Sequence, residues 1–224
     1  MSIKSSGLLT IAALCLCFSF SCQTKSEKAF KIFNEGVAFS LDAADAQQKG
    51  AFEKSAQLNK KAIEKFKETL QIDSNHKVAR SALAHSLYLH GQFSEAINWF
   101  EKANKTDTPT AVNFLELGMC KVNLGQVKQG SQSIEKALKL DTSKELRANT
   151  ALDLEDVGVR AFSFGKQYIA NGDGENGKNY QHFALSVLMT AFNFDNTQKD
   201  ISTKIVAFAD EMHEKAIADK YRNK

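Results

Sequence analysis

Two consecutive stretches of equal length decide the fold: KVARSALAHSLYLHGQFSEAINWFEKANKTDTPT (77–110) and AVNFLELGMCKVNLGQVKQGSQSIEKALKLDTSK (111–144). The same kinds of residue recur in both at a step of 34, starting with Leu83, Ala84, Leu87, Gly91, Phe93, Ala96, Phe100 and Ala103. Their counterparts are Leu117, Gly118, Lys121, Gly125, Val127, Gly130, Ile134 and Ala137. Such a period is typical of helical hairpins that bury their apolar faces by stacking on neighbours. The pattern therefore predicts a protein that presents a surface.

The small residues indicate how each hairpin packs. Ala84 and Gly118 follow a leucine on the first helix, and a small side chain there lets the second helix approach closely. Gly91 and Gly125 stand where the first helix must end, because glycine adopts the left-handed cap conformation without steric cost. The second helix then presents apolar residues at i, i+4 and i+7, which is one face of a helix.

These units resemble the tetratricopeptide repeat family, including Pro109 just after a second helix. Each unit closes on an aspartate, at Asp73, Asp107 and Asp141. The resemblance is carried by residues 77–110 and 111–144. It implies an all-α, right-handed solenoid of helical hairpins whose usual role is to hold other proteins.

The flanking residues 29–76 and 145–197 are predicted to be modified copies, related by a constant displacement from Gly36 to Gly158. The second-helix face of the first copy, Ala62, Phe66, Leu70, Ile72 and Asp73, corresponds to Ala184, Leu188, Phe192, Phe194 and Asp195. Gly36 is further from Ala62 than Ala84 is from Ala96. The outer repeats therefore carry extra turns on both helices or a longer loop.

Residues 198–224 are predicted to be a capping helix with a basic tail. A solenoid needs such a cap to cover its open end. The apolar stripe consists of Ile201, Ile205, Phe208, Met212 and Ala216.

The N-terminus has the features of a secretory signal. One positive charge precedes an apolar run over residues 8–20, which is too short to span a bilayer comfortably. Cys22 follows Ser21 directly, and this arrangement resembles the bacterial lipobox. The resemblance implies that residues 1–21 are removed, that Cys22 is lipidated, and that residues 22–28 form a short tether. The expected location is the bacterial cell envelope, on the outer membrane, with the periplasmic or surface side undecided.

Two alternatives for this N-terminus stay open. Ser19-Phe20-Ser21 also fits the small-x-small pattern of an ordinary signal peptidase, which would release a soluble periplasmic protein. An uncleaved N-terminal anchor is the second alternative. With lipidated Cys22, only Cys120 would remain as a thiol in the mature chain, so no intramolecular disulfide could form.

Composition narrows the function classes. The 224 residues are 43% hydrophobic and 25% charged, which suits one globular domain with a sizeable core. One proline and sixteen phenylalanines suit an α-rich solenoid. The net charge of +3 comes from interspersed Lys/Arg and Asp/Glu, so neither nucleic acid nor a polybasic membrane patch is indicated.

No catalytic constellation is visible, and we expect neither an enzyme nor a cofactor or metal. The five histidines include no pair at the i, i+4 spacing of a helical metal site. Residues 171–177, NGDGENG, have the alternating oxygen side chains of a calcium loop, but Asn176 stands where such a loop needs glycine. A hairpin connector is the simpler interpretation. Cys120 is expected to be a small buried apolar residue.

The expected partner is a protein or peptide, held on the concave side that the first helices line. The predicted groove residues are Ser81, His85, Tyr88, Leu89, Gln92, Leu115, Met119, Val122 and Gln126. Family members that grip a C-terminal carboxylate use lysine and asparagine here, so this groove suits an amphipathic helix or an extended apolar segment. The alternative is that Leu115, Met119 and Val122 pack against the flanking first helices.

Three functions follow. The first is a lipid-anchored scaffold in envelope or pilus assembly. The second is a structural or surface-exposed lipoprotein without a dedicated ligand. The third is a small enzyme or ligand receptor, which would need a cluster of perturbed acids or histidines.

Overall fold

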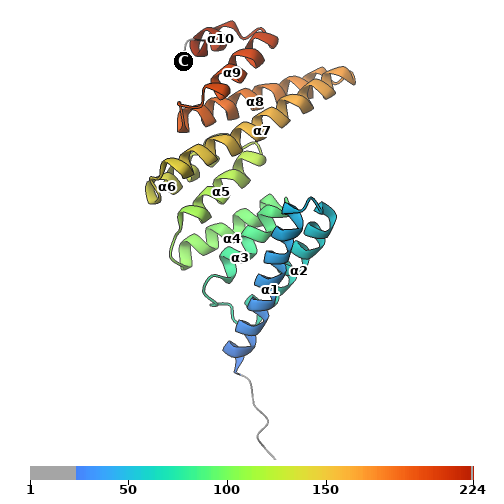
Figure 1. Ribbon diagram of the computed structural model, residues 1–224, viewed down its shortest axis with the longest axis vertical. Helices are drawn as coiled ribbons and strands as arrows, with labels where there is room; N and C mark the ends of the chain where they lie inside the picture. Colours follow the sequence, from blue (N-terminus) through green and yellow to red (C-terminus); the bar gives the residue numbers. More distant parts are fainter. Residues whose placement is uncertain (1–23, 223) are drawn as a thin grey trace, which may run out of the picture.

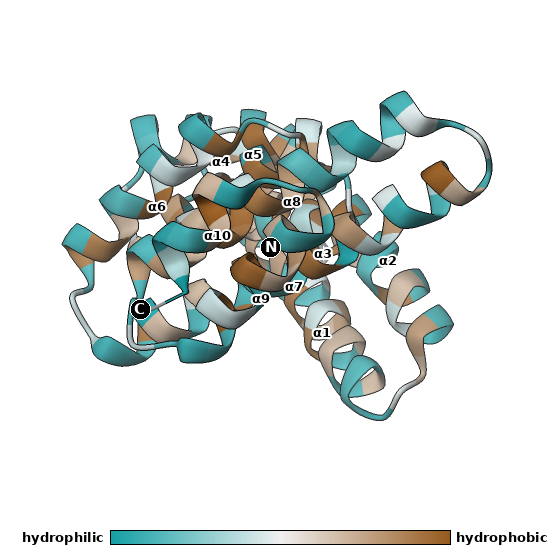
Figure 2. Ribbon diagram, turned by 90° about the horizontal axis from the view of Figure 1, so that it is seen from above, coloured by the Kyte–Doolittle hydropathy of each residue, from teal (hydrophilic) through white to brown (hydrophobic). Residues whose placement is uncertain are grey.

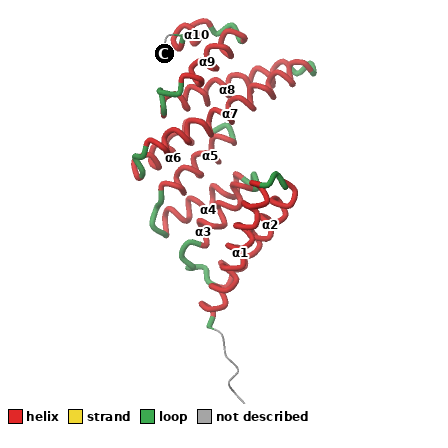
Figure 3. Tube along the Cα trace, in the orientation of Figure 1, coloured by secondary structure: helices red, strands yellow, loops and turns green. Residues whose placement is uncertain are grey.

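The computed structural model describes residues 24–222 and residue 224. This part of the chain forms ten helices and no strand (Figure 3). The helices are α1 (Lys25–Gln48), α2 (Phe52–Ile72), α3 (Ala79–Leu89), α4 (Phe93–Thr106), α5 (Ala111–Asn123), α6 (Val127–Leu140), α7 (Lys144–Ala170), α8 (Gly174–Phe194), α9 (Lys199–Glu211) and α10 (Lys215–Tyr221). The predicted all-α fold is confirmed.

The helices pack in sequential pairs, and the pairs stack along the long axis of the molecule (Figure 1). The pairs are α1–α2, α3–α4, α5–α6, α7–α8 and α9–α10. The outer hairpins have helices of 21 to 27 residues, against 11 to 14 in the two central hairpins. Their extra length therefore lies in the helices, while the turns within the hairpins stay short.

The glycines have the predicted roles. Gly91 and Gly125 have φ of 74° and 79°, the left-handed region that ends the first helix of each central hairpin. Gly118 faces α6 so closely that an added Cβ would lie 2.5 Å from Cγ1 of Ile134 and 2.8 Å from the carbonyl oxygen of Gly130. Backbone-to-backbone packing of α5 on α6 thus depends on two glycines, one on each helix.

The outer hairpins repeat one contact, as the constant displacement predicts. An added Cβ on Gly36 would lie 2.7 Å from the Phe66 ring, and one on Gly158 would lie 2.9 Å from Cγ of Leu188. In both hairpins a glycine on the first helix receives a large apolar side chain of the second. The two outer hairpins are built alike around this contact.

The apolar side chains form two main core clusters along the surfaces where helices meet, and Figure 2 shows the polar residues toward the outside. The first centres on Phe66, Leu83 and Phe100, and the second extends from α5 to α10. Tyr88 of α3 packs against both clusters. This side chain therefore links the N-terminal and C-terminal parts of the stack.

The C-terminal cap differs from the prediction of a single helix. The chain breaks at His213, whose φ is 61°, and continues as α10. Ile201 and Ile205 are buried as predicted, but Ala216 is exposed. The break changes the helical register, so Ala218 and Tyr221 are buried from α10 instead.

The predictions for the N-terminus concern mostly residues outside the described part. The predicted signal segment 1–21 and Cys22 are not among them. The predicted tether 22–28 is already helical from Lys25, because Thr24 and Glu27 form a reciprocal capping box. Within the described part, no helix combines the length and the apolar character needed to cross a bilayer.

Candidate functional site

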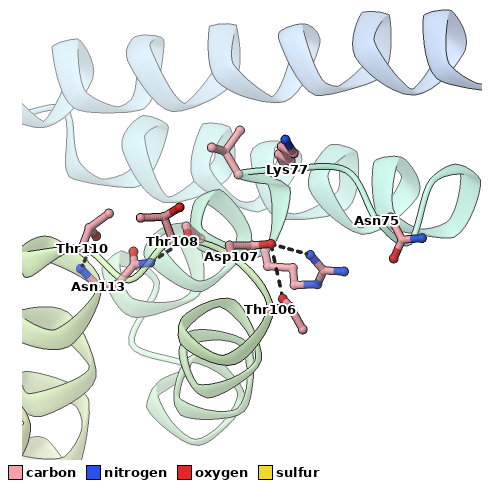
Figure 4. Close-up of a pocket in the computed structure, with 10 residues that line it drawn as sticks. Asn75, Lys77, Thr106, Asp107, Thr108, Thr110 and Asn113 are labelled. Atoms are coloured by element: carbon pink, nitrogen blue, oxygen red, sulfur yellow. Dashed lines mark hydrogen bonds and ion pairs between the residues drawn. The ribbon is translucent and has the colours of Figure 1, made fainter.

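A cleft of about 820 Å³, here called the polar cleft, opens where the α2–α3 connection faces the α4–α5 connection (Figure 4). It is lined by Asn75, Lys77, Val78, Arg80, Ser81, Thr106, Asp107, Thr108, Thr110 and Asn113. Nine of these ten residues carry a hydroxyl, amide or charged group, and Val78 is the exception. The N-terminal ends of α3 and α5 supply its inner wall.

One wall of the polar cleft results from a sequence difference between the hairpins. The helices α2, α4, α6 and α8 each end at an aspartate. Three of these carboxylates accept the backbone N–H two residues later: Asp73 from Asn75 at 3.0 Å, Asp141 from Ser143 at 2.9 Å, and Asp195 from Thr197 at 3.1 Å. Two residues after Asp107 comes Pro109, which has no N–H. Asp107 therefore cannot close this local turn.

Asp107 instead pairs with Arg80 across the cleft. Its Oδ1 lies 3.0 Å from Nη1 of Arg80, and both side chains are mostly buried. Arg80 also donates to the carbonyl oxygen of Ser74 in the α2–α3 connection. One guanidinium thus ties the two connections that face each other, which fixes the width of the cleft.

A second network positions Ser81 on the inner wall. Thr110 caps α5 by accepting the N–H of Asn113 at 3.1 Å. The Asn113 side chain, only 5% exposed, donates to Oγ of Ser81 at 2.9 Å. The buried amide is thereby held in one orientation, and the hydroxyl of Ser81 faces the cleft with a fixed partner behind it.

One helical turn further along α3, His85 contacts Glu116 of α5. Their Nδ1 and Oε1 atoms are 2.7 Å apart, and the Glu116 side chain is 13% exposed. The hydrogen bond that His85 donates to Glu116 raises the pKa of His85, against the opposing effect of burial. Ser81 and His85, both predicted site residues, therefore lie on one stripe of α3 and are both held by α5.

The structure divides the rest of the predicted groove. Leu89, Gln92 and Gln126 are exposed, whereas Tyr88 and Leu115 are half-buried against the core. Gln92 and Gln126 precede α4 and α6 at the turns within the hairpins.

The prediction that Met119 and Val122 line an open groove is wrong, since these residues are 3% and 0% exposed. They belong to the core cluster that contains Ala151, Leu154 and Val157 of α7. These three residues lie in the first half of α7, and Val122 also packs closely against Gly130 of α6. The structure agrees with the alternative prediction, in which Met119, Val122 and Leu115 pack against a flanking first helix.

Sequence reasoning missed Lys77, Arg80, Asp107, Thr108 and Asn113. These residues lie at helix ends and in connections, outside the periodic apolar pattern. One signal was available: of the four aspartates that end second helices, only Asp107 has a proline two residues later. That proline predicts a carboxylate that must find a different donor.

Other candidate chemistry is not supported by the described residues. They contain no group of three or more His, Cys, Asp or Glu side chains placed to hold a metal ion. In segment 171–177, Asp173 caps α8 by accepting the N–H of Asn176, so the segment is a short turn followed by helix. Cys120 is buried, and burial raises the pKa of its thiol to about 12. A protonated, covered thiol is a poor nucleophile.

Residues 55–137 match the protein family described as anaphase-promoting complex, cyclosome, subunit 3. The match covers somewhat more than a third of the chain, from the first turn of α2 to the last turn of α6. It includes the two hairpins that form the polar cleft. A search of the curated proteins finds no match to this sequence.

Several solved structures are similar in arrangement. A crystal structure of MamA is 17% identical, covering 80% of this chain and 89% of its own, with a TM-score of 0.46. YrrB, described as a TPR protein with an unusual peptide-binding site, is 17% identical over 88% of this chain and 89% of its own, with a TM-score of 0.41. The APC/C hetero-tetramer Cut9–Hcn1 is 16% identical over 88% of this chain and 42% of its own, with a TM-score of 0.39.

Proposed function

We propose that this protein is a non-enzymatic, lipid-anchored scaffold of the bacterial cell envelope that holds a protein or peptide partner during envelope or pilus assembly. The observation that carries the scaffold role is the polar cleft between two stacked hairpins. Its walls are fixed by buried networks, whereas Lys77, Thr108 and Thr110 expose polar groups toward solvent.

The lining of the polar cleft suits a peptide segment. An extended chain offers alternating N–H and carbonyl groups, and the cleft offers hydroxyl groups that donate and accept. Lys77 adds a positive charge, since Arg80 is already paired with Asp107. The stripe from Ser81 to His85 continues the surface along α3, so a bound segment would run from the cleft onto the inner face.

The anchor rests on the sequence of residues outside the described part. Cys22 stands two residues before the N-cap of α1. Lipid on that cysteine would hold the start of α1 close to the bilayer, with the stack extending away from it. Three acyl chains exceed the two signals that stable membrane attachment requires.

The anchor is tested by Cys22→Ala. The wild-type protein should incorporate labelled palmitate and partition into the detergent phase, and the variant should do neither. Partition of the variant with membranes, together with an unmodified wild-type N-terminus, would refute the lipoprotein proposal. Release of a soluble, unlipidated wild-type protein would instead support the secreted periplasmic alternative.

The scaffold role is tested by crosslinking and affinity capture of the tagged protein from its own host, followed by mass spectrometry. Lys77→Glu should lose the captured partner, because it reverses the charge at the cleft. Lys139→Glu, at an exposed position near the end of α6, is the matched control and should still capture the partner. Equal capture by both variants would exclude the polar cleft as the binding site.

A structural lipoprotein without a dedicated ligand is the second candidate. The burial of Met119 and Val122 favours it, because that burial removes the apolar part of the predicted groove. Under this alternative no protein would be captured in a stable ratio, and Lys77→Glu would have no effect in the host.

A further inference from the structure

A second cleft, here called the tip groove, lies at the opposite end of α3 from the polar cleft. Its volume is about 500 Å³, and it is lined by Ala43, Ala44, Gln47, Gln48, Phe52, Ser55, Ala56, Asn59, Leu89 and His90. The groove exists because the hairpins differ in length. The 24 residues of α1 and 21 of α2 extend past the end of α3, which has only 11.

The tip groove is uncharged. None of its ten lining residues is Asp, Glu, Lys or Arg, although such residues make up 25% of the chain. The nearby charges Lys49 and Asp45 neutralise each other at 2.7 Å on the exposed end of α1. A charged ligand would find no carboxylate, ammonium or guanidinium partner in this groove and would lose hydration on entering it.

Two large apolar side chains stand at the groove from different hairpins. Phe52 at the start of α2 is 68% exposed, and Leu89 at the end of α3 is 59% exposed. Alanines of α1 and α2 leave the space between them unfilled. A bulky apolar side chain placed there would cover both Phe52 and Leu89, and the removal of that surface from water would stabilise the complex.

The remaining lining groups are amides and hydroxyls, which match a peptide backbone. Asn59 is only 5% exposed and donates Nδ2 to the carbonyl oxygen of Ser86 at 2.8 Å. Its Oδ1 receives no hydrogen bond from any described residue. Gln47 also lines the groove, and its side-chain oxygen accepts from Oγ of Ser55 at 3.3 Å. A buried acceptor without a donor favours a ligand that brings an N–H group.

We propose that the tip groove binds an extended, uncharged peptide segment that carries a bulky apolar side chain. The side chain lies between Phe52 and Leu89, and a backbone N–H of the segment is directed at the Asn59–Gln47 wall. This site is separate from the polar cleft: about 16 Å of helix, at 1.5 Å per residue for the 11 residues of α3, lies between them. The proposal for the tip groove can therefore be tested independently of the function proposed above.

The test uses the purified full-length protein and a display library of random dodecapeptides. Selected peptides are expected to share an uncharged core with one Leu, Ile, Phe or Met. A labelled synthetic copy of the strongest peptide should bind about ten- to a hundredfold more weakly to Leu89→Ser and to Phe52→Ser, as expected for the loss of one apolar contact. Both residues are exposed, so the variants should fold normally.

Two controls make the result specific. Leu124→Ser removes an exposed leucine at the equivalent turn of the next hairpin, and Lys77→Glu alters the polar cleft; both should bind the peptide as the wild type does. Failure to select any peptide, selection of charged cores, or equal binding by the groove variants would overturn the proposal. So would self-association or vesicle binding that Leu89→Ser abolishes, because the occupant would then be a second copy or a lipid.

Discussion

Arg80 is paired with Asp107 at 3.0 Å because Pro109 withholds the backbone N–H that the other hairpins supply to the equivalent aspartate. A single substitution in the repeat pattern thus converts a local turn contact into a contact between two connections. The pair joins the end of α4 to the start of α3 and to Ser74 beyond it. The geometry of the polar cleft follows from this exchange of partners.

Replacing Arg80 by alanine should destabilise the protein by about 1–3 kcal/mol, because the mostly buried carboxylate of Asp107 would keep only the hydroxyl of Thr106, at 3.3 Å, as a donor. The measurement is urea denaturation followed by circular dichroism. Lys49→Ala removes an ion pair whose two side chains are well exposed, and it should change the stability by less than about 1 kcal/mol.

The role of the proline can be tested in the same background. Pro109→Ala restores an N–H two residues after Asp107, so it should recover part of the stability lost in Arg80→Ala. The same proline substitution in the wild type should give no comparable gain, since Asp107 is already paired. Equal effects in both backgrounds would show that Asp107 and Pro109 are not coupled.

Gly118→Ala should destabilise the α5–α6 hairpin by about 1–3 kcal/mol, because the new methyl group would overlap Ile134 and the backbone of Gly130. Gly174→Ala is the matched control: an added Cβ there meets nothing within 4 Å at the start of α8. Comparing the melting temperatures of the two variants distinguishes the effect of close packing from the effect of replacing a glycine. Similar melting temperatures would contradict the tight contact between α5 and α6.

The sequence contains enough information for the central register. Gly91, Gly125 and Gly118 each mark a local requirement, either a left-handed turn or a close approach, that few other residues satisfy. The outer hairpins were predictable as copies for the same reason, since Gly36 and Gly158 repeat one contact. Local constraints of this kind do not depend on what lies further along the stack.

The site was less predictable because it depends on neighbours. Met119 occupies the repeat position of the half-exposed His85, yet it is buried in a core cluster with residues of α7, and no residue of α5 reveals how α7 packs. The break at His213 was also not predictable from the sequence. The apolar stripe continues through it, so the periodicity gives no sign that the backbone adopts φ of 61° there.

The contact between His85 and Glu116 should make stability depend on pH. The hydrogen bond that His85 donates to Glu116 raises the pKa of His85 in the folded state above its value in the unfolded chain. The contribution is therefore fully present below about pH 6.5, the ordinary histidine pKa, and is lost as pH rises through the folded value. Denaturation midpoints measured from acid to alkaline pH should fall across this window.

His85→Asn should flatten that part of the pH dependence, and Glu116→Gln should bring the pKa of His85 closer to its ordinary value. The latter is followed by NMR titration of the His85 ring protons. A His85 resonance that titrates identically in wild type and Glu116→Gln would show that the two side chains do not interact in solution.

Cys120 should be inert toward thiol reagents while the protein is folded. It is fully buried, and burial raises the pKa of its thiol to about 12, so both access and the thiolate population are low. In a variant with Cys15, Cys17 and Cys22 changed to serine, alkylation by iodoacetamide at pH 8 should be at least about a hundredfold slower than in urea. Leu124→Cys in a Cys120→Ser background provides an exposed thiol nearby and should react rapidly. Rapid reaction of native Cys120 would contradict its burial. It would support the enzyme hypothesis, since the thiolate would then be accessible.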